Sequence, residues 1–519
     1  MHAVLIALSL VFLLADSALA ATFHVTTTGN DSYSCSQAQA FYTPKRSIRA
    51  GVNCATSPGD IVQVWGGTYT ERLTSATSGT SGNLITLTCR SGDTCRWRSD
   101  SANDDTTTDG QVLLVGTEFF RIEGFTFECV AASCPATVIR RYNPKASTWA
   151  ELGADPQLGF QVVNNTFTKV GNNNSDKMGP GSHIIYLQHL GAQTEPAEAD
   201  KFLVEGNTFS AVYCHGCIYT QATRYGIIRN NTITDFRQSA LGGSSTLWHA
   251  WAIRSGTDFG SDSTPGGFHI IERNSISDCV KQSYVGSDIP SCKAIRTDVN
   301  QDNNIIRYNR GWAIGDANTR GQFIQVEARC DGDQIYRNIG WDIRNENCIL
   351  VGSQGTDAPV GTQIYNNTCF NVACGIGLNH AKNATVKNNI IMGAAGAEIW
   401  VSDDTVAKGG NTFNNNLYFD PDSSTIGEWN TTATWCPSVK NNLTFAQWKT
   451  QSGGDANGLS VDPQFVSTVS GAEDLHLTAG SRAIGAGEGG TDMGAYEYDG
   501  TPGGPPVPPS PPTGLRVLQ

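Results

Sequence analysis

A short phrase built around asparagine recurs through most of the chain. In each copy a β-branched or aromatic strand leads into a polar turn that carries Asn, and a second short strand follows. The ten copies cover residues 121–127, 161–167, 203–209, 227–233, 270–276, 305–310, 334–339, 363–369, 385–391 and 411–417. The turn residues are Asn165, Asn207, Asn231, Asn274, Asn309, Asn338, Asn367, Asn389 and Asn416. The spacing between copies has a short minimum, and many copies are separated by irregular additional lengths of chain. Such a repeat predicts a solenoid with loops inserted into some coils.

The strands of this phrase are only three to five residues long, which is too short for stable isolated hairpins. The coils must therefore stack on one another. Asparagine suits the corner because it tolerates the left-handed backbone of a tight bend, and stacked asparagines can hydrogen-bond to their equivalents in neighbouring coils. The alternative, a β-sandwich with Asn-rich turns, has longer strands and lacks one recurring corner phrase.

Composition agrees with a turn-rich β protein and narrows its partners. The chain has 519 residues, of which 16% are charged and 56 are glycine; such a length is normal for a solenoid, which grows along one axis. The formal net charge is −13. An acidic surface argues against nucleic acid and anionic lipid as generic partners. An anionic polysaccharide stays possible where a local basic face or bound cations hold it.

Residues 1–20 form an apolar stretch that ends in Ala18-Leu-Ala20. Its apolar core is too short to span a bilayer, and the small residues at its end are typical of signal-peptide cleavage. We predict a secreted or extracellular protein with no membrane insertion, and we expect a monomer.

The fifteen cysteines suggest disulfides between neighbours in the sequence, because an exported chain is expected to oxidise them. The expected pairs are Cys35–Cys54, Cys89–Cys95, Cys129–Cys134, Cys214–Cys217, Cys279–Cys292, Cys330–Cys348 and Cys369–Cys374, which leaves Cys436 over. Cys214-His-Gly-Cys217 also resembles a redox or metal motif, but it lacks a βαβ context and a second CxxC. A structural disulfide is favoured there.

The residues before the repeats predict a capped first coil. A strand at 23–25, a turn at 29–31 and a short helix at 47–55 precede a buried strand at 61–65 and a turn at 66–69. A helix laid over the open end of a solenoid protects its unpaired edge.

This order, with Pro58-Gly-Asp, Ile61-Val-Gln-Val-Trp and Gly66-Gly-Thr-Tyr, resembles the start of secreted right-handed parallel β-helix proteins of the pectin-lyase-like superfamily. The ten phrases resemble that family's coils. Asp462-Pro-Gln-Phe, Asp474-Leu-His-Leu and Asp492-Met-Gly-Ala resemble the terminal coil and cap of its bacterial members. The resemblance implies an all-β fold of roughly ten or more coils. It says little about activity, because this scaffold hosts many chemistries.

The expected organisation has four parts. They are a signal peptide at 1–20, an N-terminal cap and first coil at 21–75, the β-helix with its C-terminal cap at 76–498 and a Pro/Gly-rich tail at 499–519. Within residues 421–460 we expect a lateral loop and a short helix near 444–450.

A second strand between the corner phrases carries the candidate site. Aligning its apolar pairs places one outward stripe on successive coils: Tyr186, Tyr219, Arg254, Arg296, Gln325, Leu350, Gly377 and Trp400. A second outward column contains Gln188, Gln221, Gly256, Asp298, Glu327, Gly352, Asn379 and Ser402. Lys293 and His249 flank the arginines in the sequence.

This stripe suggests a polysaccharide-binding face. Aromatic rings suit sugar rings, and arginine suits carboxylates, so Tyr186, Tyr219, Gln221, His249, Gln325 and Trp400 are candidate substrate contacts. The alternative is a solvated face on which Arg pairs with Asp and Glu.

A lyase acting on a uronate polymer is the first functional hypothesis, since it needs a base and a cation that neutralises a carboxylate. Lys293, Arg254 and Arg296 are candidates for these roles. The second is a glycoside hydrolase using Asp298 and Glu327 as its carboxylate pair. The third is a non-catalytic glycan-binding or adhesive protein. No catalytic signature of the polygalacturonases or pectate lyases is present, so no catalytic residue is carried over from the family.

Calcium is the one cofactor that the sequence suggests. Asp298-Val-Asn-Gln-Asp302, together with Glu327, offers the hard oxygen ligands that Ca²⁺ prefers.

Overall fold

The computed structural model describes residues 20–500 apart from 99–109, 129–136, 144, 146–147, 171–182, 238–249, 257–265, 280–290, 317–318, 353–356, 433–435 and 437–442. Almost all of the expected signal peptide and nearly all of the tail lie outside this range. None of the helices described in it is long and apolar enough to span a lipid bilayer.

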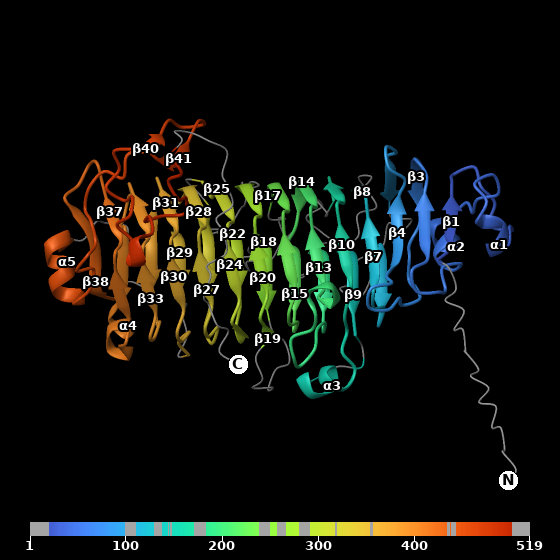
Figure 1. The fold of residues 1–519 in the computed structure, drawn as a ribbon, viewed down its shortest axis with the longest axis horizontal. Helices are drawn as coiled ribbons and strands as arrows, with labels where there is room; N and C mark the ends of the chain where they lie inside the picture. The colour runs from blue at the N-terminus through green and yellow to red at the C-terminus, as the bar shows by residue number, and fades with distance from the viewer. Residues whose placement is uncertain are drawn as a thin grey trace, which may run out of the picture.

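The described chain is a right-handed parallel β-helix, as the repeat predicted. Three long sheets run along the rod (Figure 1), and from residue 85 onward each coil contributes one strand to each sheet. Every pairing between neighbouring coils is parallel up to the last strand of the third sheet, which is antiparallel.

Sheets 1 and 2 carry the two strands of the corner phrase. Sheet 1 consists of β1 (Thr22–Val25), β2 (Ile61–Val64), β4 (Ile85–Cys89), β7 (Phe120–Glu123), β10 (Gln161–Val163), β13 (Leu203–Glu205), β16 (Ile227–Arg229), β20 (Ile270–Glu272), β24 (Ile305–Arg307), β27 (Gln334–Tyr336), β30 (Gln363–Tyr365), β33 (Thr385–Lys387) and β36 (Thr412–Asn414). Sheet 2 consists of β3 (Gly67–Thr70), β5 (Cys95–Arg98), β8 (Phe125–Glu128), β11 (Thr166–Thr168), β14 (Thr208–Tyr213), β17 (Thr232–Arg237), β21 (Ser275–Cys279), β25 (Arg310–Ile314), β28 (Ile339–Ile343), β31 (Thr368–Phe370), β34 (Ile390–Met392) and β37 (Leu417–Phe419).

Sheet 3 carries the second strand between the phrases. It consists of β6 (Val112–Val115), β9 (Thr137–Tyr142), β12 (His183–Gln188), β15 (Gly216–Gln221), β18 (Ala250–Gly256), β22 (Ser291–Thr297), β26 (Arg320–Val326), β29 (Asn347–Val351), β32 (Cys374–Leu378), β35 (Ile399–Ser402), β38 (Thr425–Thr431) and β39 (Leu443–Thr444). Two short pairs lie outside the three sheets: β19 (Gly266–Gly267) with β23 (Gln301–Asp302), and β40 (Phe465–Ser467) with β41 (Asp474–Leu477). The helical segments are α1 (Cys35–Ala38), α2 (Ile48–Val52), α3 (Trp149–Ala154), α4 (Asp403–Lys408), α5 (Phe445–Ser452), η1 (Glu198–Asp200) and η2 (Glu488–Gly490).

The corner asparagines form a continuous hydrogen-bonded ladder. Asn309 Oδ1 accepts hydrogen bonds from the backbone N–H and the Nδ2 of Asn274, at 3.0 and 2.9 Å, and Asn309 makes the same two donations to Asn338. The pattern runs from Asn165 to Asn416 and ends on the carboxylate of Asp455. The stacking prediction is confirmed.

The expected backbone role of these asparagines is wrong by one position. The left-handed residue is the one before each ladder asparagine, for example Tyr308 (φ 57°) before Asn309 or Gly206 (φ 67°) before Asn207. The ladder position is occupied by Asn because its amide both donates and accepts.

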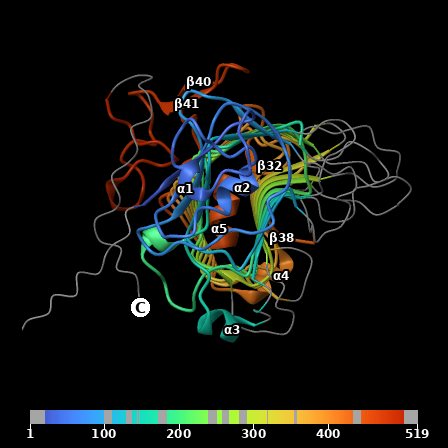
Figure 2. The ribbon, with the colours of Figure 1, turned by 90° about the vertical axis from the view of Figure 1, so that its right-hand side faces the viewer.

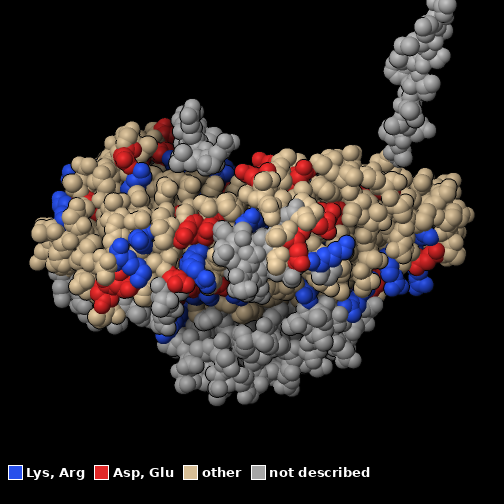
Figure 3. Space-filling model, turned by 90° about the horizontal axis from the view of Figure 1, so that it is seen from below, with Lys and Arg blue, Asp and Glu red and all other residues tan. Residues whose placement is uncertain are grey.

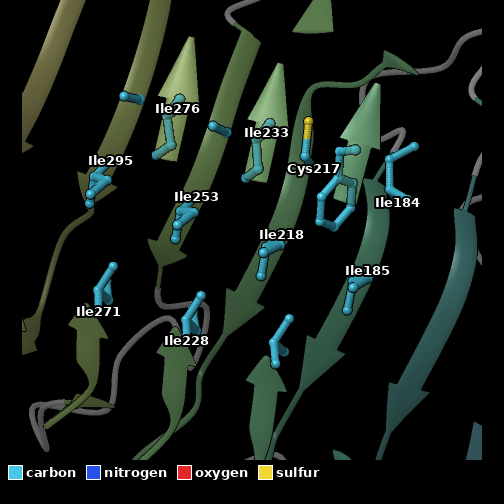
Figure 4. Packing of buried hydrophobic residues seen from close by; sticks show 14 of the residues in the cluster. Ile184, Ile185, Cys217, Ile218, Ile228, Ile233, Ile253, Ile271, Ile276 and Ile295 are labelled. Atoms are coloured by element: carbon cyan, nitrogen blue, oxygen red, sulfur yellow. The ribbon is translucent and has the colours of Figure 1, made fainter. Parts of the chain in front are cut away.

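Inside the rod, aliphatic side chains stack coil on coil. Figure 4 shows the column Ile185, Ile218, Ile253 and Ile295 from sheet 3 opposite Ile228 and Ile271 from sheet 1. These side chains are fully buried. Their burial stabilises the stack through the hydrophobic effect and fixes which side of sheet 3 faces out.

The N-terminal opening is covered by a helix, as expected. α2 lies against β1 and β2 so closely that a Cβ on Gly51 would stand 2.4 Å from Val25 Cγ2. Asp31 accepts hydrogen bonds from the N–H groups of Arg46 and Ser47, just before this helix. The Cys35–Cys54 disulfide joins the first residue of α1 to the second residue after α2.

At the other end, α5 closes the coil. Thr444 caps this helix with its side chain, and Trp448 is fully buried against Phe413, Trp429 and Tyr418. The indole Nε1 of Trp448 donates to Asp455 Oδ2 at 2.9 Å. The helix expected near 444–450 is therefore present, but it forms an end cap rather than part of a lateral loop.

Replacing Trp448 with phenylalanine is expected to lower the free energy of unfolding by about 1–3 kcal/mol, because one buried hydrogen bond and part of the packing are lost. Denaturant titration measures this change. Phe445→Leu, on the same helix and only partly buried, should cost less. An equal or smaller loss for Trp448→Phe would argue against this end cap.

The segment from Asp462 to Tyr498 does not close the end of the helix. It lies along the outer face of sheet 2 (Figures 1 and 2, red), where Phe465, Leu477 and Met493 pack near Ile339, Ile390 and Leu417. Gly494 N donates to Asn388 O at 2.7 Å, and Arg337 pairs with Glu497. The expected terminal cap is thus a lateral strap.

Six disulfides are present among the described residues. Four are the expected Cys35–Cys54, Cys89–Cys95, Cys214–Cys217 and Cys279–Cys292, and the other two are Cys348–Cys369 and Cys374–Cys436. The pairings Cys330–Cys348 and Cys369–Cys374 were wrong, because Cys348 and Cys374 bond to cysteines of other coils rather than to their neighbours in the sequence. Cys436 is paired, and Cys330 is a buried free thiol. The pair Cys129–Cys134 lies outside the described residues. Such a set of disulfides fits a protein exported to an oxidising compartment.

Candidate functional site

The outward stripe of sheet 3 has the register that the sequence predicted. Tyr186, Tyr219, Arg254, Arg296, Gln325, Leu350, Gly377 and Trp400 are in register on eight successive strands. In the view along the rod, sheet 3 forms one wall, marked by the labels β32 and β38 (Figure 2). The structure thus brings the predicted arginines and tyrosines together on one face.

The aromatic rings of this stripe are covered on both faces. Tyr186 and Tyr219 stack with ring centroids 5.1 Å apart. The guanidinium of Arg140 lies 5.3 Å from the ring of Tyr186, and that of Arg254 lies 4.6 Å from the ring of Tyr219. These contacts are cation–π interactions. The expectation that the two tyrosines offer open ring faces to a sugar is therefore wrong.

Trp400 does not face solvent either. It is fully buried, packs with Leu350, Cys374 and Ala397, and lies across Gly377, where a Cβ would stand 2.5 Å from the ring. Its Nε1 donates to Asn347 Oδ1 at 2.7 Å. The indole is thus a structural wedge between coils, which corrects its predicted role as a platform for substrate.

The polar candidates have different outcomes. Gln221 Oε1 accepts from Tyr186 Oη and from Gln188 Nε2, so this amide oxygen is already bonded. Gln325 Oε1 accepts from Lys293 Nζ. His249 lies outside the described residues.

The two stacked arginines are neutralised by two carboxylates. Arg254 donates to Asp298 through Nε, at 3.0 Å, and through Nη2. Arg296 Nη2 lies 3.2 Å from Asp298 Oδ1 and 3.0 Å from Glu327 Oε1. Although burial alone would raise the pKa of Asp298, the charges of Arg296 and Arg254 outweigh it and hold that pKa well below its usual range. Asp298 is therefore ionised throughout the neutral range.

Sequence reasoning missed one more outward column. It contains Trp251, Lys293, Gln322 and Asn347, which are in register two residues before the aligned isoleucines. Strict alternation would point these residues inward. The residue after each of them, such as Ala294 or Phe323, is buried in the core instead. That residue and the isoleucine after it both face inward, so the column two positions before the isoleucine faces outward.

Lys293 is the chemically distinctive member of this column. It is only 4% exposed, and its ammonium donates to Gln325. Burial, together with the nearby charge of Arg296, lowers its pKa to about 8, against the opposing effect of Glu346, Glu327 and Asp298. A lysine with such a pKa carries a useful fraction of neutral amine near neutral pH.

Several buried polar atoms around Lys293 have no hydrogen-bond partner among the described residues. They are Arg296 Nε, Gln325 Nε2, Gln322 Nε2 and Oε1, Asn347 Nδ2, Glu346 Oε2 and Ser291 Oγ. Native proteins satisfy most buried polar groups. A concentration of unpaired atoms on three adjacent strands therefore indicates a place where polar partners bind.

The predicted calcium ligands do not form a site. Within the described ranges, no three acid, histidine or cysteine side chains lie close enough together to hold a metal ion. Asp298 and Glu327 face guanidinium groups instead, and Asp302 Oδ1 accepts from the backbone N–H of Asp331. The donor set therefore does not fit Ca²⁺.

No comparable charged face is seen on the side of the rod shown in Figure 3. There, basic and acidic side chains are interspersed, and most of the visible surface carries neither. The net acidity of the chain is thus not gathered on that side.

Comparisons with known proteins show no family for this chain. No protein-family model and no curated protein sequence matches it. Several solved structures are similar at low identity. One is a complex of XylC with xylose, at 10% identity and a TM-score of 0.45, covering 79% of this chain and 86% of that one.

Two further similar structures are the periplasmic alginate epimerase AlgG and the PL6-family alginate lyase AlyGC. AlgG is 10% identical with a TM-score of 0.40, covering 72% of this chain and 77% of that one. AlyGC is 14% identical with a TM-score of 0.44, covering 82% and 57%. At these values the comparisons identify no site residue, and the argument about the site depends on its own geometry.

His183 gives a pH-dependence that can be measured. Its ring lies 4.5 Å from that of Tyr219 and is almost fully buried. Burial, and then the charges of Arg254 and Arg140, lower its pKa to about 3. The folded state therefore binds this proton less readily than the unfolded state, and the contribution of His183 to stability is present above about pH 6.5 and is lost as the pH falls towards 3.

Between pH 6 and 4, the stability of the wild type should fall more steeply than that of His183→Phe, by about 1.4 kcal/mol per pH unit at most. Denaturant titrations of both proteins across this range measure the difference. Phenylalanine keeps an aromatic ring in the stack but cannot titrate. Parallel curves for the two proteins would contradict a neutral, buried His183.

Proposed function

We propose that this protein is a secreted carbohydrate-active enzyme that cleaves a uronate-containing polysaccharide by β-elimination. The proposal rests on one observation: two unpaired donors, Arg296 Nε and Gln325 Nε2, lie on adjacent coils beside a lysine whose pKa is about 8. A carboxylate accepts such donors, and a lysine of this pKa is suited to act as a base.

In the proposed reaction, Lys293 in its neutral form takes the proton from the carbon next to the uronate carboxylate. Arg296 and Gln325 hold that carboxylate, and Arg254, linked through Asp298, keeps Arg296 in place. The C–H electron pair becomes a carbon–carbon double bond while the glycosidic C–O bond breaks. The departing oxygen takes a proton from solvent. The donors stabilise the charge that develops on the carboxylate.

A hydrolase is less well supported by the same residues. Its general acid must hold a proton at neutral pH, usually through a raised pKa. The pKa of Asp298 is lowered, and Glu327 pairs with Arg296. Neither carboxyl group is arranged as a proton donor.

A glycan-binding protein without turnover is the second candidate. It is favoured by the fact that both arginines already pair with carboxylates. It predicts that a uronate polymer is retained but not cleaved, and that Arg296→Ala reduces this retention.

The test is incubation with polygalacturonate, alginate and glycosaminoglycans, with and without calcium. Absorbance from new carbon–carbon double bonds is the expected result. Retention of a polymer without any absorbance would favour the binding protein. New reducing ends without absorbance would indicate a hydrolase and overturn the proposal.

A further inference from the structure

A second group of buried polar atoms with no partner in the described part of the chain lies beside the arginines, on β22 and β26 and at the start of β29. It consists of Gln322, Asn347, Glu346 and Ser291, and we call it the amide cluster. Gln322 is in register with Lys293, and Gln322 and Asn347 each stand two residues before a pair of aligned isoleucines, Ile324 and Ile349. None of these four residues takes part in the proposed elimination step.

Gln322 is the centre of the amide cluster. Its side chain is fully buried, yet neither its amide nitrogen nor its amide oxygen has a hydrogen-bond partner among the residues that the structure describes. An unpaired buried amide lowers stability, because the group has lost its hydrogen bonds to water without replacement. A leucine at this position would avoid that loss, so the amide is expected to have a use.

The neighbours of Gln322 supply both kinds of hydrogen-bonding group. Asn347 Nδ2 is an unpaired donor, Glu346 Oε2 is an unpaired oxygen, and Ser291 Oγ can act in either role. Asn347 is held in place because its Oδ1 accepts from Trp400. Glu346 Oε1 lies 3.9 Å from Arg320 Nη1.

Mixed donors and acceptors suit hydroxyl groups rather than an anion. A sugar hydroxyl both donates and accepts, and a side-chain amide can bond two neighbouring hydroxyls at once. A carboxylate offers only acceptors, and Glu346 would repel it. The chemistry therefore differs from that of the carboxylate-binding donors Arg296 Nε and Gln325 Nε2 on the adjoining column.

We propose that the amide cluster is a subsite for a neutral sugar residue, next to the position of the uronate carboxylate. This deepens the proposed function and rests on it for the class of polymer. The preferred substrate is then a heteropolymer in which a neutral sugar adjoins a uronate, and not a polymer of uronate alone.

The experiment compares Gln322→Leu with the wild type in two measurements. The first is the shift in melting temperature caused by tetrasaccharides of glucose, xylose, galactose and mannose, each added alone. We expect at least one to raise the melting temperature of the wild type and to have at least tenfold lower affinity for Gln322→Leu. The free variant should melt at a higher temperature than the wild type. Gln363→Leu, on the exposed outer face of β30, is the matched control and should bind like the wild type.

The second measurement is cleavage of a neutral-sugar–uronate heteropolymer against cleavage of a pure polyuronate. Gln322→Leu should lower activity on the heteropolymer at least tenfold more than on the polyuronate. Loss in Gln322→Leu of a tetrasaccharide-induced shift supports the subsite even if no polymer is cleaved, which separates this inference from the lyase proposal. A more stable variant with unchanged binding and unchanged preference would mean that the amide cluster holds ordered water only, and would overturn the inference.

Discussion

Replacing Asn309 with alanine is expected to lower the free energy of unfolding by about 3–6 kcal/mol. The side chain is fully buried in the middle of the ladder. Its removal leaves the backbone N–H of Asn274 without its partner and takes one hydrogen bond from the carbonyl of Ile271, and an unpaired buried group costs about 1–3 kcal/mol. The space left by the amide adds to this loss.

Denaturant titration followed by circular dichroism measures the effect. Asn457→Ala is the matched control, since that side chain is exposed and its change should be within about 0.5 kcal/mol. A loss below about 1 kcal/mol for Asn309→Ala would show that the ladder contributes little to stability and that stacking of the apolar core is sufficient.

Replacing Lys293 with methionine is expected to reduce β-elimination at least about 100-fold, because the base is removed while the size of the buried side chain is kept. In the wild type, the neutral amine is scarce well below pH 8 and becomes the main form above it. The rate should therefore rise about tenfold per pH unit up to about pH 7 and level off above about pH 8.

A pH–rate profile on the polymer that the enzyme cleaves, measured as new absorbance, provides this test. Lys387→Met is the control, because Lys387 lies on sheet 1 and pairs with Glu488. Its profile should match that of the wild type. A rate that stays flat between pH 6 and 9, or a Lys293→Met variant with near-normal activity, would rule out Lys293 as the base.

The fold was predictable because every coil needs the same type of residue at its corner in order to stack on the next coil. An amide that donates and accepts in the same place must recur at every coil, so the asparagines mark the coils in the sequence. The residue before each asparagine carries the left-handed bend, and it varies: Tyr308, Arg337 and Gly206 all occupy this position. Asn164, Asn230, Asn366, Asn388 and Asn415 also occupy it, and an Asn-Asn pair in the sequence does not show which of its two residues carries the bend.

The site was only partly predictable, for two physical reasons. The register of Arg254 and Arg296 follows from the repeat, but the stacking of Arg254 on Tyr219 and Trp251 depends on side-chain directions that spacing does not give. Gln322 was missed because the residue before each aligned isoleucine faces inward together with that isoleucine, which breaks the expected alternation. The sequence did contain a signal for this column: Trp251, Lys293, Gln322 and Asn347 all stand two residues before an aligned isoleucine.

Two of the disulfides could not be predicted from the spacing of cysteines along the chain either. Cys348 bonds to Cys369 and Cys374 to Cys436, with sequence separations of 21 and 62 residues. In a solenoid, the nearest cysteine in space can lie on another coil, and the lengths of the intervening coils and loops then set the separation in the sequence. Pairing by proximity along the chain fails wherever coils differ in length.

The asparagine ladder also gives the rod a direction. Each side chain donates to the next coil towards the C-terminus, and the last one donates to the carboxylate of Asp455. Nine side-chain amides aligned in this way polarise one another. The series ends on a carboxylate, which when ionised accepts hydrogen bonds but cannot donate one. Every junction between two internal coils has the same donor, an asparagine Nδ2, and the same acceptor, an asparagine Oδ1. A coil can therefore be gained or lost at such a junction without altering its neighbours' connections, whereas the terminal carboxylate fits only where the series stops.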